Sequence, residues 1–393
     1  MTTHDDLLER RADYPVLARS TYLASHTLGA MHRRTPDRLA AYSALWAELG
    51  VTAWEDWATE AWRVADLVGS LVGAPPGTTV MRQNVADLLG DVISCFDWHG
   101  RRNRVVTNAL SWPGSLNTWS QIGRLGGEPV VVPGEPDGVH LDVQRMVDAI
   151  DERTLLVDCS HVLFRTSTLV DVRPLVERAH EVGAVVLVDG YQAAGTVPVD
   201  VVDLGVDLYV GGSVKYLSGG PGNGFMYVAP HLQLEPVTTG WFGVARPFDF
   251  DAELRYAEGV KRFRGGTPGI PAAYAAAPAY EALAEIGVAR VRERSQSMTQ
   301  ALLESALERG FAVRSPRDPA QRGGHVTVDP GTDAVSSQQV HDELHRRGFV
   351  VDHRPGVGIR VSPHFYNSLD EALACLDAMQ DVLAGGAAVT LGA

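Results

Sequence analysis

In the middle of the chain, short uninterrupted runs of apolar, β-branched residues alternate with longer stretches of helical periodicity. The strand-like runs lie at residues 104–110, 129–133, 154–160, 184–189, 207–210 and 225–228. Helical patterns separate some of these runs, as at residues 142–150 and 174–182. Continuous apolar strands joined by helices are typical of a parallel sheet that is buried on both faces. The pattern therefore predicts an α/β domain with a mostly parallel central sheet.

The two ends of the chain follow other patterns. Helical stretches surround a short turn at 25–29, and a helix from about Trp54 to Val72 ends at the breaker sequence 73–77. In the last third, a long helical pattern is interrupted near Gly287 and is followed by short strands and two more helices. We therefore expect an N-terminal segment at 1–50, a large domain at 51–255 and a small α+β domain at 256–393.

Composition and charge exclude several classes of protein. With 34 basic and 48 acidic residues, the formal net charge of −14 disfavours an extended nucleic-acid surface. No apolar run approaches the roughly 18 residues of a membrane span, and the first residues do not resemble a signal peptide. Three widely spaced cysteines suggest neither a disulfide framework nor a zinc site, and the histidines show no metal-binding spacing. We expect a cytoplasmic protein without metal, nucleic-acid or membrane partners.

The clearest chemistry lies in the segment 186–228. One apolar strand ends at Asp189, and the next leads to Lys215, just before a glycine-rich run. Because sites in open α/β sheets form at the carboxyl ends of strands, we expect both residues to face one crevice. Such a pair suits pyridoxal phosphate (PLP), since the amine forms a Schiff base with its aldehyde and the carboxylate keeps its ring nitrogen protonated. The chain has two lysines, and the other, Lys261, lies in a charged, solvated stretch.

Further motifs resemble class V PLP enzymes of fold type I, and kynureninases most of all. The resemblance runs from about Tyr22 to Ser368 and is strongest from Asp189 to Gly222. It rests on six motifs along the chain. They are an N-terminal turn (22–29), an aromatic-proline pair (112–113), a Ser-His-Val run (160–166), two glycine-rich segments (240–243 and 263–268) and a C-terminal arginine motif (358–368). It implies a mostly parallel sheet in a PLP-binding large domain, and a smaller C-terminal α+β domain.

The resemblance assigns residues to the cofactor ring. Lys215 would be the Schiff-base lysine and proton shuttle, and Asp189 would pair with the ring nitrogen. Trp112 would cover one ring face, and His161 would lie over the ring near its phenolic oxygen, unless it is a structural histidine at a strand end. Gln192 takes the place of a family histidine and would approach the cofactor, with a purely structural role as the alternative.

Other residues are implied for the phosphate and for a second subunit. The phosphate is a dianion that favours a helix N-terminus, and the backbone of Asn84 and Val85 precedes a helical pattern. The Ser213 hydroxyl would add a further donor. Trp241 and Thr267 match segments that reach the PLP phosphate of a neighbouring subunit, so the resemblance implies a homodimer with its active sites at the subunit interface.

For the substrate, the resemblance assigns the α-carboxylate to Arg360, whose planar fork suits bidentate binding. His26 and Thr27, in the N-terminal turn, would also lie near the substrate. The turn has His-Thr where kynureninases have Asn-Ser, and Val214 precedes the lysine where they carry tyrosine. Thr267 replaces an asparagine near the aromatic end of kynurenine. The amino-acid end of the site is therefore expected to be kept while the side-chain specificity differs.

We therefore expect a PLP-dependent enzyme that acts on a β-substituted alanine, with an S-substituted cysteine as one candidate. It would cleave the Cβ substituent by elimination, as in C–S lysis, or by kynureninase-type hydrolysis. An aminotransferase, an epimerase or a decarboxylation-coupled deaminase of the same fold is the alternative. A third hypothesis, outside the enzymes, is a non-catalytic protein of this fold that acts as a binding module.

Overall fold

A seven-stranded sheet forms the centre of the computed structural model, which describes residues 5–389. The strand order is β2-β8-β7-β6-β5-β3-β4, and neighbouring strands from β7 to β4 are parallel. The strands are β2 (Thr79–Arg82), β3 (Arg104–Asn108), β4 (Glu128–Val132), β5 (Thr154–Ser160), β6 (Val185–Asp189), β7 (Leu208–Gly212) and β8 (Gly224–Val228). Six of them coincide with the predicted apolar runs to within two residues at either end.

The edge formed by β2 and β8 departs from the parallel pattern. β8 runs antiparallel to β7, and β2 runs antiparallel to β8. The short connection from β7 through the glycine-rich run allows a direct return, because an antiparallel neighbour needs no crossover helix. The hydrophobic pattern did not predict β2, which is four residues long and follows a run of Pro, Gly and Thr.

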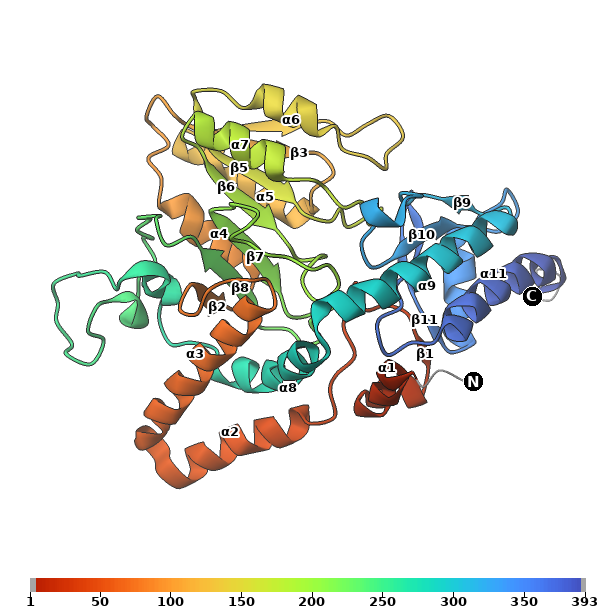
Figure 1. Cartoon of the computed structure of the whole chain (residues 1–393), viewed down its shortest axis with the longest axis horizontal. Helices are drawn as coiled ribbons and strands as arrows, with labels where there is room; N and C mark the ends of the chain where they lie inside the picture. The colour runs from red at the N-terminus through yellow and green to blue at the C-terminus, as the bar shows by residue number, and fades with distance from the viewer. Residues whose placement is uncertain (1–4, 390–393) are drawn as a thin grey trace.

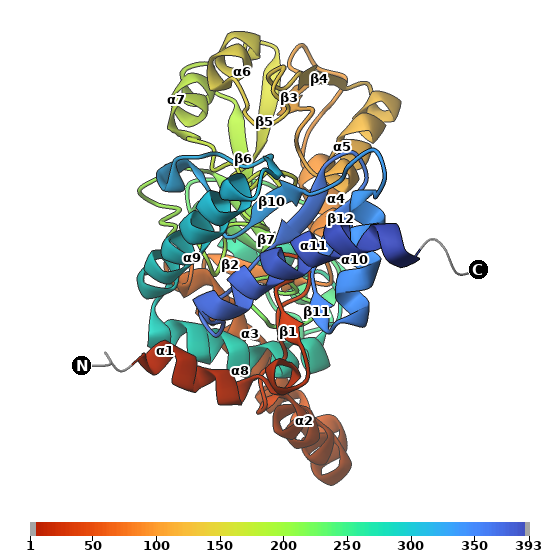
Figure 2. The same cartoon turned by 90° about the vertical axis from the view of Figure 1, so that its right-hand side faces the viewer.

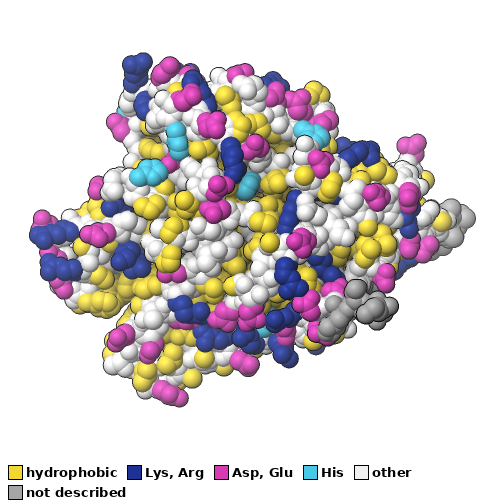
Figure 3. All heavy atoms as spheres, viewed as in Figure 1, with side chains coloured by type: hydrophobic (Ala, Val, Ile, Leu, Met, Phe, Trp, Pro, Cys, Tyr) yellow, Lys and Arg dark blue, Asp and Glu magenta, His cyan; other side chains and the backbone are white. Residues whose placement is uncertain are grey.

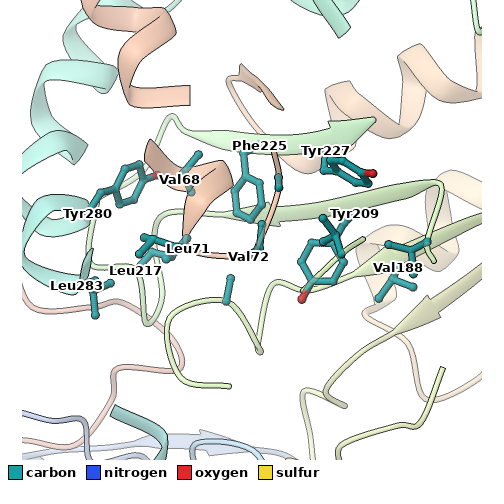
Figure 4. Packing of buried hydrophobic residues seen from close by; sticks show 14 of the residues in the cluster. Val68, Leu71, Val72, Val188, Tyr209, Leu217, Phe225, Tyr227, Tyr280 and Leu283 are labelled. Atoms are coloured by element: carbon teal, nitrogen blue, oxygen red, sulfur yellow. The ribbon is translucent and has the colours of Figure 1, made fainter. Parts of the chain in front are cut away.

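Helices cover both faces of this sheet, as Figures 1 and 2 show. They are α4 (Val85–Ser94), α5 (Pro113–Ser120), α6 (Val143–Ala149), α7 (Arg173–Glu181), α3 (Trp54–Ser70) and α8 (Ile270–Ile286). The C-terminal end of α3 and the residues that follow it pack on the sheet: Val68 and Val72 lie near Phe225, and Leu71 lies near Leu217, in Figure 4. α2 (Thr35–Leu49) and α3 form a helical hairpin that projects from the sheet.

The C-terminal part builds a second, four-stranded antiparallel sheet in the order β12-β13-β10-β9. Its strands are β9 (Ala312–Val313), β10 (Val326–Asp329), β12 (Asp352–Arg354) and β13 (Gly358–Val361), and its helices are α9 (Val288–Glu308), α10 (Ser337–Arg346) and α11 (Leu369–Val389). α8 belongs to the core of the large sheet, whereas α9 contributes to a separate core with β10 and β13. The division at residue 256 stays a prediction, and this packing favours a boundary near Gly287.

The N-terminal segment joins the two parts. After α1 (Asp6–Glu9), β1 (Thr21–Tyr22) pairs in parallel with β11 (Phe349–Val350) of the C-terminal part. Gly29 then donates its N–H to the Val214 carbonyl at 2.7 Å. A Cβ atom at Gly29 would lie 2.2 Å from the Lys215 carbonyl oxygen, so a residue without a side chain is required for this close approach. The turn at 25–29 is therefore fixed beside the lysine.

The surface carries an apolar region on one side. Phe248, Phe250 and Leu254 are exposed on the loop that projects beside the α2–α3 hairpin, and at the left of Figure 3 hydrophobic side chains lie along the lower edge of this part, below charged ones. Trp241 of this loop packs against Trp54 of α3, so the loop and the hairpin form one continuous face. Within residues 5–389, no helix combines the length and hydropathy needed to cross a membrane.

Candidate active site

Two adjoining cavities lie at the carboxyl ends of the parallel strands. One, of about 280 Å³, contains Lys215 and Arg360, and the other, of about 300 Å³, contains Asn84 and Val85. Trp112, Asp189 and Tyr191 line both. The sequence-based expectation of a crevice shared by Asp189 and Lys215 agrees with this geometry, because β6 ends at Asp189 and the neighbouring β7 leads into the loop with Lys215.

Lys215 sits between aromatic rings and charged groups. Its Nζ lies 4.5 Å from the Tyr191 ring centroid and 5.7 Å from that of Trp112. Burial lowers the pKa of the Lys215 amine to about 7; Asp189 opposes this effect, and Arg360 adds to it. Because the free amine is the nucleophile toward a carbonyl, this environment prepares Lys215 for covalent chemistry near neutral pH.

Asp189 is buried at the junction of the two cavities. One carboxylate oxygen accepts the Tyr191 backbone N–H at 2.8 Å. Burial raises the pKa of Asp189, and the Tyr191 N–H and the Lys215 amine counteract that rise. In the described part of the chain, no cationic side chain forms an ion pair with this carboxylate. A cationic group bound in the junction would supply that partner, which is the role expected of a protonated ring nitrogen.

The second cavity receives the N-termini of two helices. Asn84 caps α4 by accepting the Asp87 N–H, so the first N–H groups of the helix lie at the cavity that Asn84 and Val85 line. Ser115, in the first turn of α5, lines the same cavity. Its lining includes no lysine or arginine. Helix N-termini and hydroxyl groups provide donors for an anion without a nearby basic side chain.

Arg360 lies on β13 in the wall of the first cavity and is only 1% exposed. Its Nε and Nη2 donate to one oxygen of Asp352 at 2.8 and 2.6 Å, and its Nη1 donates to the Phe164 carbonyl at 2.6 Å. A guanidinium has five N–H groups, so these three bonds leave one on each Nη atom. Arg360 is thus held rigidly and keeps two donors for a further anion.

Asp352 and Arg354 were not singled out from the sequence. Arg354 lines the cavity of Lys215, and its Nη2 lies 3.2 Å from the second Asp352 oxygen. Burial alone would raise the pKa of Asp352, but His26 and Arg360 hold it well below its usual range. One local signal for them was available in the sequence, namely the short strand pattern that became β12. Residues two apart in a strand share one face, so Asp352 and Arg354 point to the same side.

His26, Thr27 and Gln192 line the cavity as well. Both ring nitrogens of His26 are buried without a hydrogen-bond partner, as are the Thr27 hydroxyl and the Gln192 Oε1. Burial, assisted by the charge of Arg360, lowers the pKa of His26 to about 3, so its imidazole is neutral. His26 packs on the buried His325 ring, with the centroids 4.9 Å apart. These unpartnered polar atoms favour a ligand with hydrogen-bonding groups.

Two residues assigned through the family resemblance lie elsewhere. His161 lines neither cavity, and its Nδ1 contacts the Tyr209 hydroxyl at 3.2 Å, because side chains alternate along the strand end and Ser160 faces the site instead. The Ser213 hydroxyl donates to the Asn223 carbonyl at 2.9 Å and contacts the Tyr280 hydroxyl. Neither side chain lines the two cavities, and their expected contacts with a cofactor stay predictions.

Trp241 and Thr267 also lie outside the two cavities. The Trp241 Nε1 donates to the Pro247 carbonyl within its own loop, and Thr267 borders a separate cavity with Arg82 and Arg264. Neither residue lines the cavity of Lys215 within one chain. Among residues 5–389, no cluster of three or more metal-ligating side chains is present.

The two cavities fit the parts of PLP. The second offers N–H and hydroxyl donors to a phosphate, the junction offers a buried carboxylate and aromatic rings, and the first offers an amine. Trp112 is 44% exposed at the junction, which leaves its indole face accessible to a planar ring. The orphaned polar atoms of His26 and Gln192 lie on the substrate side of this arrangement.

Comparisons with known proteins agree with this geometry. Residues 47–370 match the family model described as aminotransferase class-V. An uncharacterized aminotransferase, YcbU of Bacillus subtilis, is 30% identical over 93% of this chain and 95% of its own. A kynureninase of Geobacillus thermodenitrificans is 25% identical over 96% of this chain and 92% of its own.

A solved structure shares the fold at lower sequence identity. It is a complex between a cystine C–S lyase and its reaction product, cysteine persulfide. The two structures align with a TM-score of 0.84 and 20% identity, over 94% of this chain and 99% of the other. This likeness supports fold type I, with its mostly parallel central sheet.

Proposed function

The chain belongs to the aminotransferase class-V family, its cofactor is PLP, and we propose that it cleaves the Cβ substituent of a β-substituted L-alanine. An S-substituted cysteine is the preferred substrate class. The observation that carries the proposal is the cavity that joins a nucleophilic lysine to an arginine with two free donors. The cystine C–S lyase of the same fold and the kynureninase relatives both act on substrates of this type, by their names.

PLP, when bound, supplies an electron sink that stabilises negative charge at the substrate Cα. Lys215 would anchor the cofactor and then, as a free amine, take the proton from Cα; the electron pair of that C–H bond would expel the Cβ substituent, which would leave with a proton. The lowered pKa of Lys215 suits it to this proton transfer near neutral pH. Arg360 binds the α-carboxylate through the two N–H groups that Asp352 and Phe164 leave free. The fixed guanidinium thereby orients the Cα–H bond toward Lys215.

The fate of the leaving group follows from what the cavity lacks. Its walls are formed in part by Val162, Phe164 and Val214, and none of the cysteines of the chain lines it. Burial raises the pKa of Cys95 to about 12, and Cys159 and Cys375 are fully buried. Sulfur transfer to the protein needs a thiolate within reach of the substrate. The sulfur therefore leaves with the released thiol, while pyruvate and ammonia form from the remainder.

Transamination is the second candidate, because the relative with 30% identity is named an aminotransferase. In that reaction Lys215 would move the proton away from Cα without loss of the Cβ substituent. The two outcomes differ in their products. Elimination releases ammonia, whereas transamination transfers the amino group to a keto acid and leaves the side chain intact.

The test is to incubate the PLP-loaded protein with an S-alkyl cysteine, cystine and kynurenine, and to measure thiol, pyruvate, ammonia and anthranilate. Pyruvate and ammonia in equal amounts, with the thiol from the S-alkyl cysteine or the persulfide from cystine, support C–S lysis, and anthranilate would instead indicate hydrolysis of kynurenine. The Lys215→Ala variant controls for reactions of free PLP. A variant with all three cysteines replaced by alanine should retain the activity, and its complete loss would contradict departure of the sulfur with the product. No product from any substrate would refute the proposal.

We further propose a homodimer in which Trp241 and Thr267 complete the site of the other subunit. Their separation from Lys215 within one chain and the exposed apolar loop around Trp241 support this arrangement. Light scattering coupled to size exclusion should give twice the mass of the chain. Mixing refolded Lys215→Ala and Thr267→Ala protomers should restore activity that neither variant has alone, if sites are shared. A cytoplasmic location stays a prediction from the sequence.

A further inference from the structure

Tyr191 lies in the centre of the site, and no role has yet been assigned to its side chain. Its ring lines both cavities, and Lys215 Nζ lies 4.5 Å from the ring centroid. Trp112 is the other aromatic residue that lines both cavities, at 5.7 Å from the same amine. The amine that receives the cofactor aldehyde therefore lies near two aromatic rings, contributed by segments that are far apart in the sequence.

The position of the Tyr191 ring is built into the fold. Its backbone N–H holds the Asp189 carboxylate at 2.8 Å, which fixes where the side chain starts. Gly212, at the end of β7, makes room for the ring: a Cβ atom there would lie 2.3 Å from the Tyr191 hydroxyl oxygen and ring carbon Cζ. The backbone φ of Gly212 is not positive, so its conformation does not by itself require glycine. Glycine is required there because the Tyr191 ring fills the space that a side chain would need.

We propose that Tyr191 and Trp112 form the two faces of a slot that holds the planar pyridine ring of the cofactor. The inference rests on the PLP-binding function proposed above. Asp189 lies at the edge of the slot, at the junction of both cavities, where the ring nitrogen would meet it. A flat, electron-poor ring between two electron-rich aromatic rings gains stacking energy on both faces. Tyr191 is therefore a cofactor-binding residue.

The aromatic face of Tyr191, not its hydroxyl, carries this role. Burial raises the pKa of the phenol to about 12, and the Asp189 charge adds to that effect, so the ring stays neutral at physiological pH. A neutral ring stacks in the same way with or without its hydroxyl group. Phenylalanine should therefore replace tyrosine, whereas leucine, which keeps apolar bulk without an aromatic face, should not.

The experiment measures PLP affinity in the Lys215→Ala background, where covalent attachment does not mask the contribution of stacking. Equilibrium dialysis against PLP should give a Kd about tenfold higher for Tyr191→Leu and within about twofold of the parent for Tyr191→Phe, given the usual magnitude of aromatic stacking. In the lysine-containing protein, the circular dichroism of the visible PLP band should decrease for Tyr191→Leu and persist for Tyr191→Phe.

A substitution at Gly212 tests the position of the Tyr191 ring while leaving Tyr191 itself in place. Gly212→Ala should displace the Tyr191 ring and raise the Kd for PLP, whereas Gly90→Ala, at an exposed helical position with open space, serves as the control. Far-ultraviolet circular dichroism checks that each variant is folded. An unchanged Kd for Tyr191→Leu would overturn the inference, as would an equal loss for Tyr191→Phe and Tyr191→Leu. Failure of the parent protein to bind PLP would instead refute the proposed function.

Discussion

The lowered pKa of Lys215 predicts how fast the cofactor-free protein captures PLP at different pH values. Burial shifts the pKa of this amine from the ordinary 10.5 to about 7. At pH 8, roughly 90% of Lys215 would then be the free amine, compared with about 0.3% for an ordinary lysine. If only the neutral amine attacks the aldehyde, its effective concentration is about 300-fold higher in the protein.

The assay is stopped-flow absorbance of the visible band that appears when PLP joins the lysine. The rate constant for capture should rise with pH through about 7 and become constant above about 8. Nα-acetyl-lysine, whose ε-amine is free, is measured in the same buffers and controls for the titration of PLP itself. Its rate should continue to rise up to about pH 10. A protein rate that keeps rising in parallel with Nα-acetyl-lysine would refute the shifted pKa and the role of burial in producing it.

Three further predictions concern the walls of the site. Arg354 lowers the pKa of Lys215, so Arg354→Gln should move the midpoint of the capture profile to higher pH. Asp352 raises the pKa of Lys215, so Asp352→Asn should move the midpoint to lower pH. Shifts in the same direction would contradict this electrostatic origin. Arg360→Lys should raise the KM for the amino acid about ten- to a hundredfold, measured in steady-state assays, because one ammonium cannot serve both Asp352 and the substrate; an unchanged KM would refute carboxylate binding there. Gly29→Ala should lower the free energy of urea unfolding by roughly 1–3 kcal/mol, since its Cβ would lie 2.2 Å from the Lys215 carbonyl oxygen, whereas Gly90→Ala should be neutral or stabilising.

Local sequence patterns were sufficient for the central elements. β5 spans Thr154–Ser160, the range of its apolar run, because a strand buried on both faces has a continuous hydrophobic signal. The pair Asp189 and Lys215 followed from the same logic, since chemistry-bearing residues at the carboxyl ends of adjacent strands meet in one place. β2 was missed because a short edge strand has little hydrophobic pattern of its own and depends on pairing with β8.

The residues around the substrate depended on the register and orientation of distant segments. His161 follows a motif of the family, yet alternation at the end of β5 turns Ser160 toward the cavity and His161 toward Tyr209. Asp352 and Arg354 join the site only because β12 pairs with β13, which carries Arg360. The local strand pattern places Asp352 and Arg354 on one side of their strand, but it does not report that this strand pairs with the one that carries Arg360.

The sequence by itself determined the α/β architecture and pointed to the candidate Schiff-base lysine and the carboxylate beside it, because each depends on short-range periodicity and residue type. The tertiary structure decided which side chains share the cavity, the lowered pKa of Lys215 and the approach of the Tyr191 and Trp112 rings to its amine. These properties arise from burial and from contacts between segments far apart in the chain. Burial and long-range contact exist only once the chain has folded, so the composition of any one segment cannot specify them.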